Sequence, residues 1–327
     1  EFIYCTSKDR YDKNNFKEYM NSINAHRHYN LVSEDTITNS DNYMFVNLKY
    51  QLKNNNENIE KEGNVLMKQK EIGIITVLAE ETQAVIEQLK LIKQPSKFGQ
   101  RTYYTGELEG EGTTHQVVLT QQLNQGQESV ISAYNDLAQK FAPKIIFLIG
   151  IAGGIHEDAD YCDVVIGEEI IGYDKQKDTP NGISRRGSSY RIDAKMKPII
   201  QSFTQEILKK PITASENSKY NTIRVHNENI GSGSAVIANE LSTITEWIHN
   251  YNDKVFAVEM EAFGFSTAFY ESSLNDVAAC SVCIIRGISD LADTKKKKIK
   301  KYRFPAASNA AIVLKELVKF LPGFSEK

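Results

Sequence analysis

Acidic side chains follow two apolar runs of this chain, and a glycine-rich turn ends a third. Glu80 and Glu81 follow IGIITVLA, Asp290 follows the mostly apolar CIIRGIS, and the turn lies at 150–154 within LIGIAGG. Carboxyl groups can take up or release a proton during a reaction, and positioned proton transfer accelerates reactions about 10²–10⁴-fold. The backbone amides of a glycine turn can also face a ligand. These three places therefore predict a catalytic or binding site.

The segments that carry these groups alternate between two kinds of periodicity. EIGIITVLAEE and KIIFLIGIAGG are typical of buried strands, whereas ESVISAYNDLAQKF and AASNAAIVLKELVKFL have the apolar spacing of amphipathic helices. Such alternation predicts an α/β fold, here a three-layer sandwich with a central mixed β-sheet flanked by helices. Ligands of these folds bind at the carboxyl ends of strands, which is where the acidic groups and the turn are expected.

The composition changes near residue 70. Residues 1–70 are rich in Asn, Lys and Glu, and QLKNNNENIEKEGN within them has the composition of a linker. We expect an N-terminal accessory region of unknown role with a linker at 1–70, and a catalytic domain at 71–327. The first region is also where a regulatory partner would bind. Because the chain begins at Glu1 rather than at a methionine, we expect further sequence upstream.

The overall composition narrows the class of protein. Of 327 residues, 41% are hydrophobic and 25% are charged, and the formal net charge is −3. This balance gives no general attraction to nucleic acid or to a membrane surface. No apolar run reaches the roughly 18 residues of a membrane helix, and the first residues lack the apolar core of a signal peptide. We expect a cytoplasmic protein that acts on a small molecule.

The cysteines suggest structural thiols. Four are present, at Cys5, Cys162, Cys280 and Cys283, which is too few for a disulfide framework in a chain of this length. The last two form a C-x-x-C, which can bind metal or carry redox chemistry. They lie in an apolar run typical of a buried strand, and no second such pair exists. We therefore expect a reducing compartment, no metal and no cofactor.

Several segments carry a family resemblance. In order, IGIITVLAEE, IGIAGGI with DVVIGEEI, GSGSAVIAN, AVEMEA and RGISDLAD resemble the signature segments of the nucleoside phosphorylase/nucleosidase superfamily, over roughly residues 71–320. These segments are similar to those of the methylthioadenosine/S-adenosylhomocysteine nucleosidases, and the basic stretch running into YRFPAASNAA is similar to the nucleosidase domains of immune-effector proteins. The resemblance implies a phosphorylase/hydrolase-like fold. It also implies hydrolysis of the N-glycosidic bond of a purine nucleoside or nucleotide, with adenine as the base.

The resemblance assigns roles to three carboxylates. Asp290 takes the place of the acid that protonates N7 of the departing purine, for which a partly dry pocket would raise its pKa. Glu81 takes the place of the base that activates water, with Glu80 as the alternative. Glu261 takes the place of the carboxylate that binds the ribose 2′ and 3′ hydroxyls and stabilises the positive charge of the transition state.

Two of these carboxylates also have simpler explanations. Ser289 and Asp290 would suit the N-cap of a helix. Glu261 would suit the start of a helix, where the helix dipole favours an acidic side chain, although Glu259 is the natural candidate for that place.

Other residues of the same segments are expected to contact the substrate. Met260 would pack on the sugar, and Val236 and Ile237 would lie at the purine, where Val236 and Ser234 replace the aromatic residue and the aspartate usual in the family. Arg286 would support the acid or serve as a buried structural arginine. The remaining candidates in these segments are Gly153 and Ser289.

Hydrolysis is favoured over phosphorolysis. The phosphorolytic members hold phosphate with an arginine before the central glycine turn and a serine within it, and here Leu148 and Ile151 occupy those positions. Neither side chain can hold an anion. The backbone amides of the turn leave weak use of phosphate open.

A basic run follows RGISDLAD. It comprises Lys295 to Lys298, Lys300, Lys301 and Arg303. The resemblance places this loop over the ribose 5′ side, where cations such as Lys295 and Lys297 would suit phosphates, as would Arg186 in the basic stretch with Lys175, Lys177 and Arg185. A 5′-phosphorylated substrate such as ATP, a neutral nucleoside, and a merely solvated surface all stay open.

Two further classes are considered. One is a purine nucleoside phosphorylase, which would share the fold and differ in the nucleophile. The other is a non-catalytic nucleotide-sensing module, which would have no need of all three carboxylates. The resemblance also implies a homo-oligomer of unspecified size.

Overall fold

The computed structural model describes residues 2–7, 29–40, 43–52, 70–95, 101–180, 182–239, 242–272, 281–293 and 300–324. The chain forms two compact units, Glu1–Val65 and Leu66–Lys327. In the first unit, the backbone forms an antiparallel sheet of three strands in the order β1-β3-β2. These are β1 (Phe2–Ser7), β2 (Tyr29–Ser40) and β3 (Tyr43–Leu52). Lys295, Lys297 and Cys280 lie outside the described residues.

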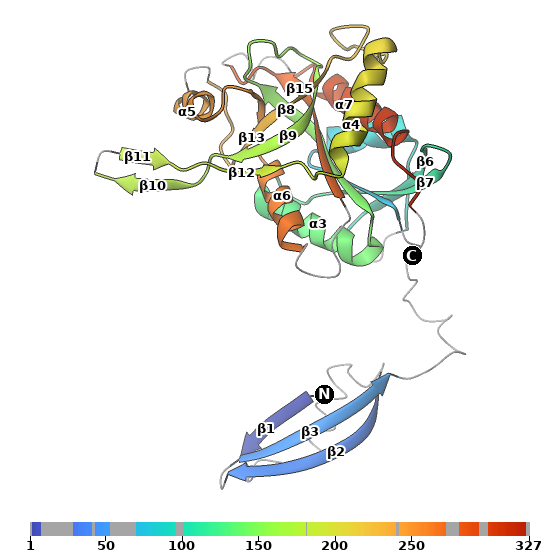
Figure 1. The fold of residues 1–327 in the computed structure, drawn as a ribbon, viewed down its shortest axis with the longest axis vertical. Coiled ribbons are helices and arrows are strands. Elements are labelled where there is room, and N and C mark those ends of the chain that lie inside the picture. Colours follow the sequence, from blue (N-terminus) through green and yellow to red (C-terminus); the bar gives the residue numbers. More distant parts are fainter. Residues whose placement is uncertain are drawn as a thin grey trace. The chain divides into compact units, whose positions relative to one another are not determined.

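The second unit is built on a mixed sheet of ten strands (Figure 1). Strands β4, β7, β8 and β15 run parallel to one another, as do β9, β13 and β14. The two groups meet antiparallel where β9 pairs with β15 and β14 pairs with β8. The strands are β4 (Ile72–Thr76), β5 (Ile92–Lys93), β6 (Tyr103–Glu109), β7 (Thr114–Gln121), β8 (Ile145–Gly154), β9 (Val164–Gly172), β12 (Ser188–Arg191), β13 (Val225–Ser232), β14 (Val255–Glu259) and β15 (Ser281–Asp290).

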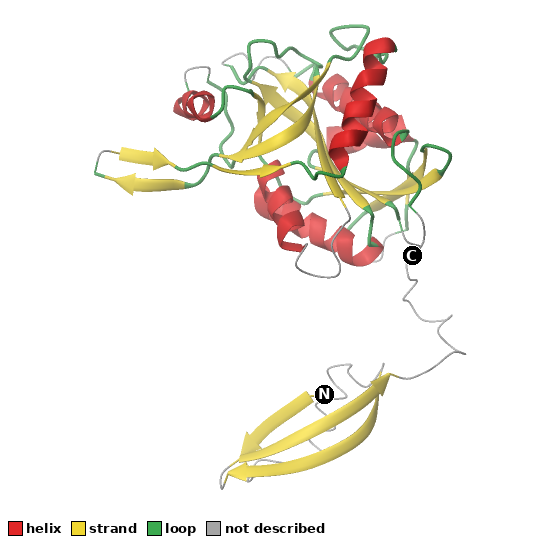
Figure 2. Ribbon diagram, viewed as in Figure 1, coloured by secondary structure: helices red, strands yellow, loops and turns green. Residues whose placement is uncertain are grey.

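Helices cover both faces of this sheet (Figure 2). One apolar core joins the sheet to α2, α4 and α7, and another joins it to α3 and α6. The predicted three-layer sandwich with a mixed sheet is confirmed. The helices are α2 (Ala79–Leu89), α3 (Gln127–Phe141), α4 (Met196–Lys209), α5 (Thr243–Tyr251), α6 (Ala262–Ser272) and α7 (Arg303–Val318).

The local sequence accounts for these elements. Strand β8 is buried almost throughout, because helices cover the sheet on both faces, and its sequence is accordingly a continuous apolar run. Helix α3 buries Val130, Tyr134, Leu137 and Phe141, which recur with the helical repeat and form one apolar stripe. Helix α7 approaches β15 very closely at Gly287, where any side chain would collide with the carbonyl oxygen of Ala306.

A two-stranded hairpin projects from the sheet. It consists of β10 (Gln176–Thr179) and β11 (Gly182–Arg185), and it extends away from the body of the second unit (Figure 1). Within the described residues, no helix is long and apolar enough to cross a membrane. The described part of the chain also contains no group of three or more His, Cys, Asp or Glu side chains placed to hold a metal ion.

Candidate active site

A cavity of about 170 Å³ lies where the carboxyl ends of several strands meet. Its walls come from the β4–α2 connection, the end of β8, the β14–α6 connection and the end of β15. The predicted site residues that line it are Glu81, Gly153, Val236, Ile237, Met260, Glu261, Ser289 and Asp290. A larger cavity of about 330 Å³, between α4 and strands β9 and β13, contains none of these residues. The smaller cavity is therefore the candidate active site.

Glu81 points into the protein, whereas its neighbour Glu80 is exposed. Glu81 is 2% exposed, and one carboxylate oxygen accepts the backbone N–H groups of Val77 and Leu78, both at 2.8 Å. The other oxygen accepts the N–H of Ile151 at 2.9 Å. Burial raises the pKa of Glu81, and the charge of Arg286 opposes this shift. Of the two candidates for the base, Glu81 is the one that reaches the cavity.

Arg286 is completely buried and belongs to β15, the strand that ends at the cavity. Its Nη2 donates to Glu259 and lies 3.5 Å from Glu261 Oε2. Of the two interpretations of Arg286, these contacts favour the buried structural arginine over support for Asp290. Four residues of strand separate the Cα atoms of Arg286 and Asp290 by about 13 Å. Arg286 instead stabilises the acidic pair on the β14–α6 connection.

Glu259 and Glu261 divide two tasks between them. Glu259 accepts the N–H groups of Glu261 and Ala262, each at 3.0 Å, and so takes the place at the start of α6. Glu261 lines the cavity, and its Oε1 accepts the N–H of Gly126 at 2.8 Å. Burial and the neighbouring charge of Glu259 raise the pKa of Glu261 to about 7. Glu261 is therefore more than a helix-start carboxylate.

Asp290 ends β15 with its side chain at the cavity. Its Oδ1 accepts the N–H of Ala292 at 3.1 Å, and its Oδ2 accepts the hydroxyl of Ser289 at 2.9 Å. The chain does not enter a helix at 291–293, so the alternative of a helix N-cap is wrong. The carboxyl group is held in one orientation and remains only 7% exposed.

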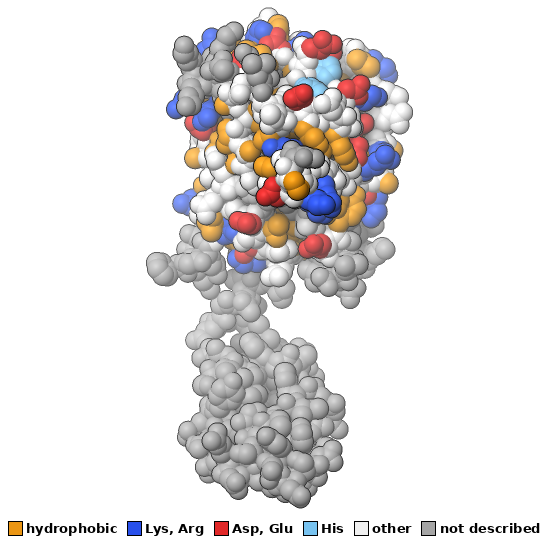
Figure 3. Space-filling view, turned by 90° about the vertical axis from the view of Figure 1, so that its left-hand side faces the viewer, with side chains coloured by type: hydrophobic (Ala, Val, Ile, Leu, Met, Phe, Trp, Pro, Cys, Tyr) orange, Lys and Arg blue, Asp and Glu red, His pale blue; other side chains and the backbone are white. Residues whose placement is uncertain are grey.

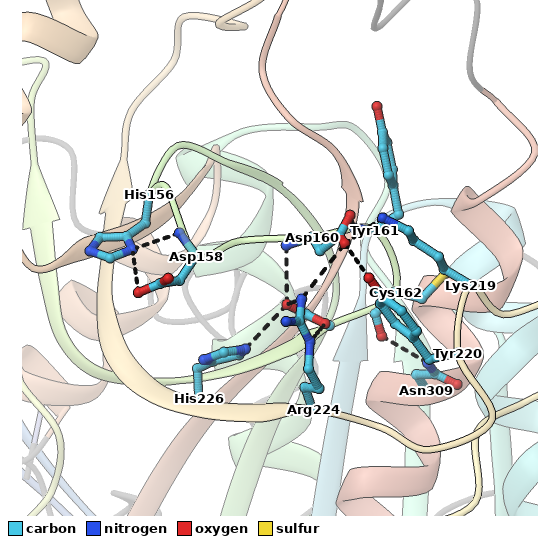
Figure 4. Close-up of polar contacts among 11 residues, drawn as sticks. His156, Asp158, Asp160, Tyr161, Cys162, Lys219, Tyr220, Arg224, His226 and Asn309 are labelled. Atoms are coloured by element: carbon cyan, nitrogen blue, oxygen red, sulfur yellow. Dashed lines mark hydrogen bonds and ion pairs between the residues drawn. The ribbon is translucent and has the colours of Figure 1, made fainter.

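A polar cluster anchors the end of β15 (Figure 4). Asp163 is buried, and it accepts two hydrogen bonds from Arg224, at 2.8 and 2.6 Å, and lies 3.2 Å from His226 Nε2. Beside it, the N–H of Cys162 donates to the carbonyl of Ile288 at 2.8 Å, and the N–H of Ile288 donates back to Asp163 at 2.8 Å. These bonds fix the backbone two residues before Asp290.

Of the basic candidates in the described residues, Arg303 lines the cavity and Arg186 does not. Arg186 follows the projecting hairpin, is exposed and is not among the described residues that line the cavity. Arg303, from the run after RGISDLAD, does line the cavity. Gln125 and Tyr173 also line it, and no motif in the sequence singled them out.

Replacing Gly150 with alanine should lower both stability and turnover. The added methyl group would collide with Arg286 Nη1 and would lie 2.6 Å from Glu81 Oε1. Overpacking of this kind costs about 1–3 kcal/mol. Urea denaturation and an activity assay would measure the two effects. Gly323→Ala is the matched control, because its new methyl group would meet Thr113 at an ordinary 3.8 Å. Equal stability of the two variants would contradict the close approach at Gly150.

The fold and the cavity define the class of protein: an α/β domain with four buried carboxylates, from three separate segments, around one pocket. A family model described as the phosphorylase superfamily matches residues 71–319. The chain belongs to this superfamily, as the signature segments predicted.

Curated relatives give the same answer. The 5′-methylthioadenosine/S-adenosylhomocysteine nucleosidase of Listeria innocua is 29% identical over 255 residues, which cover 76% of this chain and 98% of the relative. The ATP nucleosidase Cap17 of Escherichia coli is 24% identical over 175 residues, which cover 49% of this chain and 33% of that protein. The chain therefore has relatives named for nucleoside substrates and others named for a nucleotide.

Solved structures share the fold. The 5′-methylthioadenosine/S-adenosylhomocysteine nucleosidase of Neisseria meningitidis, in complex with methylthio-immucillin-A, superposes with a TM-score of 0.60 at 23% identity and covers 76% of this chain and 99% of that chain. The futalosine hydrolase of Helicobacter pylori has a TM-score of 0.61 at 18% identity, covering 78% of this chain and 99% of that chain. The predicted phosphorylase/hydrolase-like fold is confirmed.

Proposed function

We propose that the chain is an N-ribosyl hydrolase that cleaves the N-glycosidic bond of a purine nucleoside or nucleotide, with adenine as the base. The observation that carries this proposal is the meeting of Glu81, Glu261 and Asp290 in one cavity. The matching superfamily and the nucleosidase relatives support it.

Each carboxylate has one task in the proposed reaction. Asp290 gives a proton to N7 of the purine while the bond between C1′ and N9 breaks, so that the base leaves neutral. Glu261 binds the ribose hydroxyls and stabilises the positive charge on the sugar. Glu81 takes a proton from the attacking water, whose oxygen forms the new bond to C1′. Exchange with solvent then returns Glu81 and Asp290 to their starting forms.

Arg286 suits a place beside the attacking water. Its Nε and Nη1 have no hydrogen-bond partner among the described residues, and Nη1 and Glu81 Oε1 both lie against Gly150. A buried N–H without a partner costs free energy, so a water between Arg286 and Glu81 would satisfy it. In the proposed reaction these two side chains hold that water from opposite sides.

The glycine turn favours water over phosphate. The N–H of Ile151, a backbone amide of this turn, already donates to Glu81 and is not free to bind a phosphate. A carboxylate bound at this point would also repel an anion when ionised. The side chain of Leu148 is buried and apolar. Together these features support hydrolysis rather than phosphorolysis.

Chromatography of the free base tests the proposal. Adenosine, methylthioadenosine, AMP and ATP are each incubated with the protein, with and without inorganic phosphate. We expect adenine to be released without phosphate, together with the free sugar or sugar phosphate. Release that requires phosphate, with ribose 1-phosphate as the product, would identify a phosphorylase. Binding without release from any substrate would identify a nucleotide-sensing module.

We also propose a homo-oligomer. Leu123, Ile183 and Val236 are 74%, 61% and 61% exposed, and Val236 belongs to the cavity wall. Figure 3 looks at the side from which the hairpin projects and shows hydrophobic side chains gathered in the middle of this face. A second copy would cover such a surface.

Two further proposals concern the N-terminal unit and the cellular compartment. The Glu1–Val65 unit is compact by itself, which suits binding of a regulatory partner. Cys162 and Cys283 are buried free thiols, which suits a reducing compartment such as the cytoplasm.

A further inference from the structure

Arg303 brings a positive charge to the wall of the catalytic cavity. It is the first residue of α7 and the one cation among the described residues that line this cavity. Its guanidinium forms no ion pair with any carboxylate in the part of the chain that the structure describes. The four other charged residues of the described wall are acidic: Glu81, Glu259, Glu261 and Asp290.

The backbone before Arg303 is held in place. The ring of Tyr302 stacks on Tyr161, with 4.7 Å between ring centroids and 28° between the ring planes. Lys219 lies 5.8 Å from the centre of the Tyr161 ring and also binds Asp160 (Figure 4). Because the segment with Tyr161 also pairs with β15, Arg303 is fixed relative to the end of that strand.

The positions of the carboxylates indicate which part of a substrate faces Arg303. With Asp290 at the purine and Glu261 at the 2′ and 3′ hydroxyls, the remaining branch of the ribose is the 5′ carbon. Arg303 is among the residues of the described wall that are assigned neither to the base, nor to the ribose hydroxyls, nor to water, and it is the cation among them.

Charge balance then distinguishes the possible substrates. Arg286 already pairs with Glu259 and Glu261, which leaves Arg303 as the cation of the described wall that a substrate can meet. A neutral nucleoside offers the Arg303 guanidinium no charged partner. A phosphate carries about −1.5 to −2 charges at pH 7 and accepts two hydrogen bonds from one guanidinium. Without such a cation, the acidic wall would repel an anionic substrate.

We propose that Arg303 selects substrates that carry a phosphate on the ribose 5′ carbon, so that the hydrolase acts on purine nucleotides rather than on neutral nucleosides. This inference rests on the proposed hydrolase function. It assigns to Arg303 a contact with the substrate but no part in breaking the bond.

The test compares kcat/KM for adenine release from AMP and from adenosine. Arg303→Met removes the charge and keeps an unbranched apolar stem, and Arg303→Lys keeps the charge. Arg191→Met is the control, because Arg191 is exposed on β12 and is not among the described wall residues. We expect wild type to prefer AMP. Arg303→Met should lower the value for AMP about 10- to 100-fold and that for adenosine less than about twofold. Arg303→Lys should recover most of the AMP activity.

Other results would overturn the proposal. An equal loss on both substrates in Arg303→Met would indicate a structural role, and an unchanged preference for AMP would place the phosphate elsewhere. If no variant and no wild type released adenine, the proposed function would fail, and calorimetric binding of AMP would still test Arg303. Equal affinity of wild type and Arg303→Met for AMP would then reject the phosphate contact itself.

Discussion

Replacing Asp290 with asparagine should lower turnover about 10²–10⁴-fold and leave the fold intact. Asparagine has nearly the same shape, and its carbonyl oxygen can still accept the N–H of Ala292. Its amide cannot transfer a proton to N7 of the purine. The base would then leave as an anion, and the barrier to bond breaking would rise. Single-turnover release of adenine and thermal unfolding would measure the two quantities separately.

Asp158→Asn is the matched control for this variant. The side chain of Asp158 is 77% exposed and lies near His156, outside the described cavity wall. We expect wild-type turnover from it. Wild-type turnover in Asp290→Asn would reject the acid assignment, whereas a large loss of thermal stability in that variant would show that the carboxyl group serves mainly to hold the end of β15.

The fold could be predicted from the sequence because the patterns that indicate each strand and helix are local. The run at 145–154 is apolar throughout, since both faces of β8 are covered, and Val130, Tyr134 and Leu137 mark one face of a helix without reference to the rest of the chain. The periodicity of each segment therefore identified its element. The alternation of elements then identified the class of fold.

The contacts between side chains of the site were harder to predict from the sequence. Motifs marked Glu81, Glu261 and Asp290, which the structure brings to one cavity, but periodicity did not separate Glu81 from Glu80. One of the two interpretations of Arg286, support for Asp290, was based on their closeness in sequence. The pairing of β14 with β8, and of β8 with β15, instead carries the acidic pair on the β14–α6 connection to the guanidinium of Arg286.

The sequence did not predict two further features, because both depend on contacts between segments that are far apart along the chain. Asp163 and Arg224 are far apart along the chain, and nothing in either segment predicts that they meet. Arg303 was visible only as one charge in a basic run. Its place in the cavity wall depends on how the start of α7 is held by Tyr302 and Tyr161, which no short motif encodes.

Replacing Glu81 with glutamine should lower turnover by a similar factor, about 10²–10⁴-fold. The amide cannot accept a proton from water. It also exchanges one carboxylate oxygen for an NH₂ group, while Val77, Leu78 and Ile151 all donate to this side chain. At least one donor would then face another donor, and leaving such a group without a partner costs about 1–3 kcal/mol. Turnover and urea denaturation should both report the change.

Glu80→Gln is the natural control, because Glu80 is the exposed neighbour on the same turn of α2. It makes the same chemical change one residue away and should leave both quantities near wild type. If Glu80→Gln lost activity and Glu81→Gln did not, the base would be the exposed residue, and the hydrogen bonds of Glu81 would serve the fold alone.

The pH dependence of wild-type turnover should reflect the raised pKa values of the buried carboxylates. Burial raises the pKa of Glu81, and burial with the charge of Glu259 raises that of Glu261 to about 7. Both must be ionised for their proposed tasks, so turnover should increase with pH through about 7 rather than through the usual range near 4.5.

The same raised pKa values affect stability. The folded chain holds protons on these carboxylates that the unfolded chain has released. Between about pH 4.5 and 7, the free energy of unfolding should therefore fall as pH rises, in the direction opposite to activity. A turnover rate that levelled off below pH 5 would contradict the raised pKa values. It would mean that these carboxylates ionise normally and that water reaches them more than their burial indicates.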